Sequence, residues 1–164
     1  MIWFTSDTHF GHENMLRLAD RPWSTVAQMN DDMVASVNSK VAMDDELYIL
    51  GDFSFKMTIQ EAYELRKSIA CKRVHLLPGN HDKDWTQPAV ADAFIVEPPI
   101  CVLKIDRQKI VLSHYPWPTG RVCRTAAGIF TGISTAAAAR TTGSTSGRGF
   151  CAMTWAWTPT ATPR

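Results

Sequence analysis

Several features that define other protein classes are missing from this chain of 164 residues. It has no apolar run near the roughly 20 residues that span a bilayer, which excludes a membrane-spanning protein. No basic segment followed by a long apolar stretch opens the chain, so we expect no secretory signal and a cytoplasmic location. The four cysteines form no CxxC pair and are too sparse for a disulfide scaffold, so we expect them to be reduced.

Charge is distributed unevenly along the chain. Residues 1–118 contain all sixteen acidic and twelve of the seventeen basic residues, whereas residues 119–164 contain five arginines and no acidic residue. Thr, Ala, Gly and Ser fill 29 of those last 46 positions without a helical or strand period. We therefore expect a folded domain over 1–118 and a low-complexity basic tail outside the core over 119–164.

The first part of the chain alternates strand and helix signals with short connections. Ser24 and Thr58 are predicted N-caps, because each precedes apolar residues at helical spacing. The predicted helices cover 26–37 and 59–69, and the predicted strands cover 1–6, 46–50, 73–77, 100–105 and 109–113, the last two as a hairpin. This order of elements predicts an α/β layered fold.

Polar side chains follow four of the predicted strands directly, in the segments Asp7-Thr8-His9, Gly51-Asp52, Gly79-Asn80-His81-Asp82 and Ser113-His114. A lone Asp or His at a strand end is more often a cap or a satisfied core group than a ligand. Four such segments together indicate a site, because α/β sheets gather ligands at the carboxyl ends of their strands. Carboxylate and imidazole ligands without thiolate favour Mn, Fe, Zn or Ni over a structural zinc site.

These segments, read in order as DTH, GD, GNHD and SHYP, resemble the motifs of the calcineurin-like metallophosphoesterase superfamily. The opening SDTHFGHENM is similar to the small bacterial and phage branch of that superfamily. The resemblance covers residues 1 to about 118. It implies a four-layer α/β/β/α sandwich with two divalent metal ions.

The resemblance also implies a role for each residue of the motifs. Asp7 and His9 would hold the first metal ion, and Asn80 and His114 the second. Asp52 would bridge the two ions. The remaining implied roles are proton donation or phosphate contact by His81, orientation of His81 by Asp82, and substrate binding by Asn80 and His81. His12, which follows Gly11, is either the start of a helix whose N-terminal amides help to bind substrate or a surface cap.

The chemistry of phosphate esters explains why such residues are needed. A phosphate ester is an anion that repels hydroxide, and two cations about 4 Å apart neutralise its oxygens and acidify the attacking water. We therefore predict a metal-dependent phosphoesterase that hydrolyses mono- or diesters, acting on a phosphorylated small molecule or a nucleotide.

One motif of the superfamily is missing. A Gly-His-x-His segment should follow the SHYP segment, but no histidine lies beyond His114, so each metal ion would lose one ligand. Residues 128–135 can be encoded as GGC ATC TTC ACG GGC ATC TCC ACG, and a shifted reading frame then gives His-Leu-His-Gly-His-Leu-His. We therefore predict that the tail arises from a frameshift. Two alternatives to an active enzyme are a catalytically impaired, frameshifted homologue and, less favoured, a nucleic-acid-binding protein that uses the tail arginines.

Overall fold

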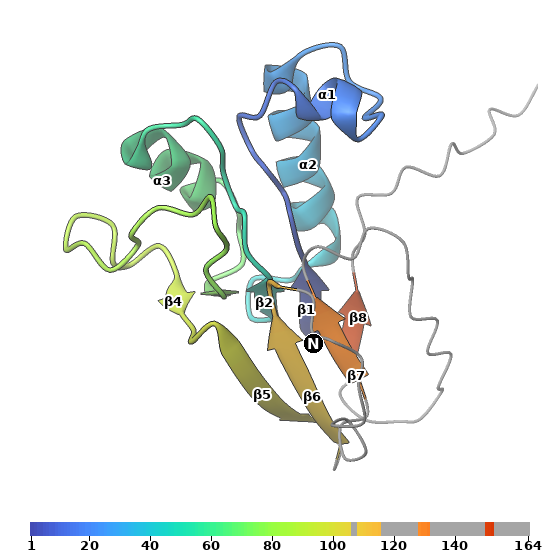
Figure 1. The fold of residues 1–164 in the computed structure, drawn as a ribbon, viewed down its shortest axis with the longest axis vertical. Helices are drawn as coiled ribbons and strands as arrows, with labels where there is room; N and C mark the ends of the chain where they lie inside the picture. Colours follow the sequence, from blue (N-terminus) through green and yellow to red (C-terminus); the bar gives the residue numbers. More distant parts are fainter. Residues whose placement is uncertain (106–107, 116–127, 132–149, 153–164) are drawn as a thin grey trace, which may run out of the picture.

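A computed structural model of the chain describes residues 1–105, 108–115, 128–131 and 150–152. These residues form two β-sheets and three helices (Figure 1). The larger sheet is parallel. Its strands, in spatial order, are β4 (Ile95–Val96), β3 (Arg73–Leu76), β2 (Glu46–Ile49), β1 (Ile2–Thr5) and β8 (Phe150–Ala152). In the smaller sheet β5 pairs with β6 antiparallel and β6 with β7 parallel, with bounds Ile100–Ile105, Gln108–Ser113 and Gly128–Thr131.

The helices are α1 (Met15–Leu18), α2 (Val26–Lys40) and α3 (Ile59–Lys67). The predicted cap of α3 is confirmed, because Thr58 and Glu61 form a reciprocal capping box. The predicted cap of α2 is wrong by one residue. Thr25 accepts the N–H of Gln28 through its hydroxyl, while the hydroxyl of Ser24 donates to the side-chain oxygen of Gln28.

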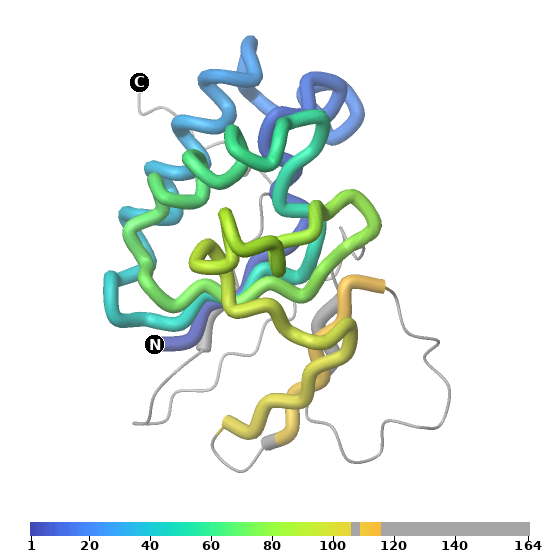
Figure 2. Tube along the Cα trace, turned by 90° about the vertical axis from the view of Figure 1, so that its left-hand side faces the viewer, coloured from blue at the N-terminus to red at the C-terminus, as the bar shows by residue number. Residues whose placement is uncertain are grey.

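The described elements form three layers, with helices, the larger sheet and the smaller sheet in that order. Figure 2 shows this order for the helices and for strands β1 to β6. One apolar core lies between the helices and the larger sheet and includes Met29, Met33, Val37, Ala62, Leu47, Ile49, Val74 and Leu76. A second core lies between the sheets and contains Phe4, Tyr48, Leu50, Leu77, Ile105, Ile110 and Leu112. The predicted α/β class is confirmed, and three of the four expected layers lie within the described residues.

The predicted strands and the hairpin are confirmed as β1, β2, β3, β5 and β6. The tail differs from the prediction, because two of its segments pair with the sheets. β7 extends the smaller sheet beside β6, and β8 extends the larger sheet beside β1. Residues 119–164 therefore contribute to both sheets, while their out-of-frame origin stays a prediction.

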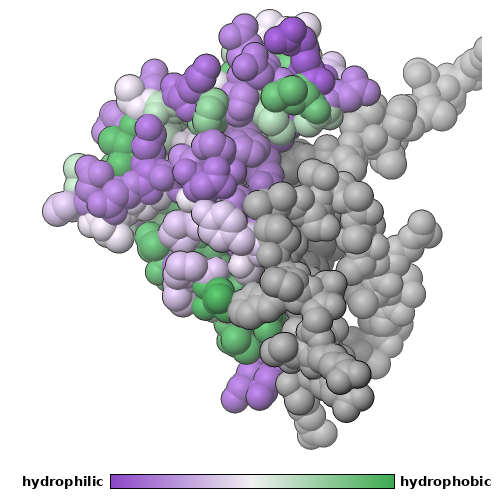
Figure 3. Space-filling view, in the orientation of Figure 1, coloured by the Kyte–Doolittle hydropathy of each residue, from purple (hydrophilic) through white to green (hydrophobic). Residues whose placement is uncertain are grey.

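The described surface changes in character from one end to the other (Figure 3). Hydrophilic residues dominate over the helices, whereas the edge strands β4 and β5 expose Ile95, Val96, Ile100 and Val102. None of the described helices has the length and hydropathy required to cross a membrane.

Candidate active site

The register of the larger sheet brings the predicted segments together. Thr5 of β1 pairs with Ile49 of β2, and Ile49 pairs with Leu76 of β3, so the three strands end at one edge. Backbone hydrogen bonds continue past the strand ends. The N–H of Asp7 donates to the carbonyl of Gly51 over 3.1 Å, and further along the N–H of His9 donates to the carbonyl of Asp52 over 2.9 Å.

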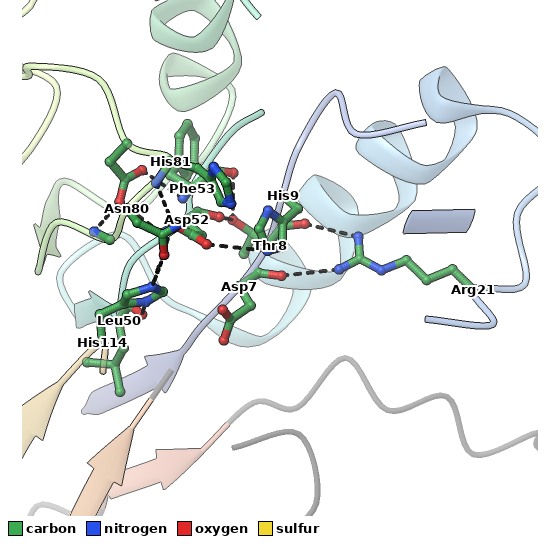
Figure 4. A network of polar contacts seen from close by, with 12 residues as sticks. Asp7, Thr8, His9, Arg21, Leu50, Asp52, Phe53, Asn80, His81 and His114 are labelled. Atoms are coloured by element: carbon green, nitrogen blue, oxygen red, sulfur yellow. Dashed lines mark hydrogen bonds and ion pairs between the residues drawn. The ribbon is translucent and has the colours of Figure 1, made fainter. Parts of the chain in front are cut away.

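Asp52 lies at the centre of the resulting cluster and is 4% exposed (Figure 4). Its Oδ2 atom is 3.6 Å from Nε2 of His9, and its Oδ1 atom is 3.7 Å from Nε2 of His114. One ligand atom each from Asp7, Asp52 and His114 lie within 4.8 Å of one another. The structure thus brings three predicted metal ligands, Asp7, His9 and His114, around the carboxylate of a fourth, Asp52, and the fifth, Asn80, contacts His114.

The imidazole of His114 is fixed in orientation by the backbone. Its Nδ1 atom lies 2.9 Å from the carbonyl oxygen of Leu50, so Nδ1–H donates to that oxygen in the neutral ring. Its Nε2 lone pair then faces Oδ1 of Asn80 at 3.1 Å and the carboxylate of Asp52. Three electron-rich atoms that converge in this way fit a cation between them.

Two buried atoms of the cluster lack hydrogen-bond partners among the described residues. They are Oδ2 of Asp7 and Nδ1 of His9. Buried polar atoms in proteins are nearly always satisfied, so unpartnered ones call for an explanation such as an ion. With their carboxylate, imidazole and amide ligands, these residues therefore fit divalent metal ions.

Burial changes the proton affinity of the same two residues. It raises the pKa of Asp7 to about 6, an effect that a hydrogen bond from Ser6 and the charge of His114 reduce only in part. Burial lowers the pKa of His9 to about 4, against the opposing effect of Asp52. The imidazole of His9 is thus neutral at physiological pH, as a metal ligand must be.

The backbone is strained at the same place. Asp7, His9 and Asp52 have φ angles of 50°, 49° and 55°, in the left-handed region that residues with a side chain rarely adopt. Such conformations cost of the order of 1–3 kcal/mol each and concentrate at functional sites. In this chain they aim three predicted ligands at one point.

Two glycines leave room for the cluster. A Cβ atom at Gly51 would collide with the ring of His114, and one at Gly79 would collide with the carboxylate of Asp52. The φ angle of Gly51 is also +80°, which glycine adopts without strain. These positions explain why glycine precedes Asp52 and Asn80 in the sequence.

The predicted role of Asp82 as the group that orients His81 is not what the structure shows. Oδ2 of Asp82 accepts the N–H groups of Asp52 and Gly79 over 2.8 Å, and its Oδ1 accepts the N–H of Phe53 over 2.9 Å. Asp82 therefore ties the segment after β3 to the segment after β2. The backbone N–H of His81 instead donates to Oδ1 of Asp52 over 3.0 Å, while its side chain is exposed.

Arg21 has a structural role that the sequence did not reveal. Its guanidinium is buried and donates from Nη1 to the carbonyl of Thr8 over 3.0 Å and from Nη2 to the carbonyl of Asp7 over 3.1 Å. It therefore holds the backbone that carries Asp7 and His9. Arginine is rarely buried, so no sequence pattern singles this residue out.

His12 lies beside the cluster, as its predicted place in substrate binding requires. Its ring is edge-on to that of His9, with centroids 5.6 Å apart, and stacks on the ring of Phe55 at 4.1 Å. Burial, followed by the charge of Lys56, lowers the pKa of His12. Phe55 is a second residue that the sequence did not single out, since it belongs to none of the four motifs.

Comparisons with known proteins agree with this geometry. A family model described as calcineurin-like phosphoesterase matches residues 1–137. Uncharacterized protein MJ1445 of Methanocaldococcus jannaschii is 37% identical over 83 residues, which cover 50% of this chain and 47% of that protein. Gene 66 protein of Mycobacterium phage L5 is 33% identical over 81 residues, which cover 49% of this chain and 39% of that protein.

A similar solved structure is that of AQ665 from Aquifex aeolicus, described as a protein of unknown function. It has a TM-score of 0.58 and 29% sequence identity, and the match covers 71% of this chain and 61% of that one. The matches span less than half the length of both curated relatives. Because the family model covers most of the sequence, this chain belongs to the calcineurin-like phosphoesterase family.

Proposed function

We propose that the chain hydrolyses phosphate mono- or diesters with two divalent ions, Mn, Fe, Zn or Ni, held around Asp52. Asp7, His9 and Asp52 would hold the first ion, and Asp52, Asn80 and His114 the second. The observation that carries the proposal is the convergence of lone pairs on Asp52, together with buried atoms of Asp7 and His9 that have no hydrogen-bond partner among the described residues.

The ions supply charge neutralisation of the phosphate and acidification of the attacking water when they are bound. The chain itself supplies alignment and a proton. His81 is attached to the centre through its backbone N–H, which donates to Asp52, while its exposed side chain is free to meet substrate. An imidazole in that place can protonate the leaving oxygen as a general acid.

We further propose that residues 1–118 carry the catalytic residues and that residues 119–164 are read out of frame, although two of their segments, β7 and β8, pair with the sheets. The support is the coincident loss of acidic residues, of histidine and of the expected Gly-His-x-His segment after residue 118. In the chain as written, each ion would have one imidazole fewer. Water or substrate oxygens would then complete the coordination.

The proposal is tested by hydrolysis of p-nitrophenyl phosphate and bis(p-nitrophenyl) phosphate with Mn, Ni, Zn and Mg in turn. Asp52→Asn should abolish a metal-dependent rate. Asp92→Asn is a matched control, because Asp92 is an exposed carboxylate paired with Lys67 on the helical layer. A wild-type chain without activity on either ester, or an Asp52→Asn variant with full activity, would refute the proposed function.

A further inference from the structure

Four aromatic rings form one connected cluster at the proposed metal centre, which includes the ligand His9. His12 and Phe55 are stacked, with centroids 4.1 Å apart and ring planes 15° apart. The ring of His81 meets Phe55 edge-on at 4.8 Å, and the ring of His9 meets His12 edge-on at 5.6 Å. The stacked pair thus touches both a proposed metal ligand and the proposed proton donor.

Neither ring of the stacked pair belongs to the proposed metal ligands or is the proposed proton donor. Both are only half-buried, so they remain accessible next to the place where the phosphate would bind. The adjacent Lys56 is exposed, and its ammonium lies 5.8 Å from the centroid of the Phe55 ring.

The backbone that presents this pair is also strained. Lys56 has a φ angle of +57°, in the left-handed region, as Asp7, His9 and Asp52 do. Strain of this kind persists where the surrounding structure imposes it, and it concentrates at ligand sites. The strained region therefore extends from the metal ligands to the segment that carries Phe55.

We propose that His12 and Phe55 form a stacking subsite for a planar ring of the phosphate ester, of which a nucleobase is the biological form. The inference rests on the proposed function and names its substrate class as ring-bearing phosphate esters such as nucleotides. Stacking of one base on an aromatic side chain changes affinity by about 5- to 150-fold. The ammonium of Lys56 adds a positive charge near the ring, suited to an anionic substrate.

A purely structural role makes a different prediction. If Phe55 and His12 served only to position His81 and His9, their loss would slow by the same factor the hydrolysis of all esters that share one leaving group. A stacking subsite instead changes the preference between an ester that carries a nucleobase and an ester with the same leaving group that lacks the nucleobase. The ratio of two rates therefore separates the two roles.

The first measurement compares kcat/KM for thymidine 5′-(p-nitrophenyl phosphate) and methyl p-nitrophenyl phosphate, which share one leaving group. The ratio should favour the thymidine ester in the wild-type chain and fall about 5- to 150-fold in Phe55→Leu and in His12→Leu. Tyr63→Leu is the matched control, because Tyr63 is a half-buried ring of α3 with the ammonium of Lys67 at 5.2 Å. That variant should keep the wild-type ratio.

The second measurement does not depend on turnover. Isothermal titration of the metal-loaded chain should show thymidine 5′-monophosphate binding more tightly than 2-deoxyribose 5-phosphate, and Phe55→Leu should remove the difference. Equal affinities of the wild-type chain for thymidine 5′-monophosphate and 2-deoxyribose 5-phosphate would overturn the subsite. So would a Phe55→Leu variant that loses the same rate on both esters and binds the nucleotide as the wild type does. Absence of hydrolysis with intact nucleotide preference would instead contradict the proposed function and leave the subsite standing.

Discussion

Replacement of Arg21 by methionine should uncouple the segment after β1 from the rest of the site. The guanidinium donates to the backbone carbonyls of Asp7 and Thr8, and its Nη1 atom also lies 3.1 Å from Sδ of Met29 in α2. Methionine fills similar space in this apolar surrounding but donates no hydrogen bond. The two carbonyls would lose their charged donor, and the strained backbone at Asp7 would lose its support.

The expected loss of stability follows from these two bonds. A hydrogen bond to a charged group contributes about 1.5–3 kcal/mol. Part of that gain is offset in the wild type, because burial of the guanidinium has a desolvation cost that methionine avoids. We therefore expect Arg21→Met to lower the free energy of unfolding by about 2–4 kcal/mol. Loss of a group that orients metal ligands typically lowers metal affinity by about 10- to 100-fold.

Arg66 provides a matched control for this experiment. It is also buried, and it donates to the carbonyls of Ala93, Ile69 and Cys71 in the helical layer, away from the metal ligands. Urea unfolding should show a loss of stability for both Arg21→Met and Arg66→Met, whereas calorimetric titration with Mn should show weaker binding for Arg21→Met alone. Equal metal affinities of the two variants would refute the positioning role of Arg21.

Three further predictions concern protons and ligands. Because burial raises the pKa of Asp7 to about 6, metal affinity should fall up to tenfold per pH unit below pH 6 and level off above pH 6. Calorimetric titrations with metal should then show proton release from Asp7 at pH 5 and none at pH 7.5. His81→Ala should keep its metal ions yet slow turnover by about 10²- to 10⁴-fold for alkyl leaving groups and much less for p-nitrophenol, and equal losses would argue against proton donation. A single-base correction near the codons for residues 118–127 should restore Gly-His-x-His and raise both metal affinity and rate by orders of magnitude, whereas an intact frame on resequencing would contradict the frameshift.

The elements of the fold were predictable where local signals act alone. The capping box of Thr58 and Glu61 starts α3, and the polar turn between apolar runs gives the hairpin of β5 and β6. β4 was not predicted, because its two residues carry no periodicity and pair with β3 only through the tertiary fold. The pairing of β7 with β6 and of β8 with β1 was missed for a similar reason. Strand pairing between segments that are distant in sequence leaves no pattern in β7 or in β8.

The site shows the same division between local and tertiary information. Asp7, His9, Asp52 and His114 could be proposed as ligands because each follows an apolar strand directly or closely, and the structure brings the ends of these strands from both sheets together. Contacts that depend on three dimensions were not predictable. The carboxylate of Asp82 binds backbone N–H groups of two segments, which a sequence motif cannot distinguish from a contact with the adjacent His81.

Metal stoichiometry tests most directly the proposal that two metal ions would share Asp52 as a ligand. The chain is dialysed against saturating Mn or Zn, and bound metal is counted per chain in the wild type and in Asp52→Asn, with Asp92→Asn as the control carboxylate. We predict two ions per chain in the wild type and in Asp92→Asn, and loss of both in Asp52→Asn. Retention of two tightly bound ions in Asp52→Asn, or a wild-type chain that binds none, would contradict the account.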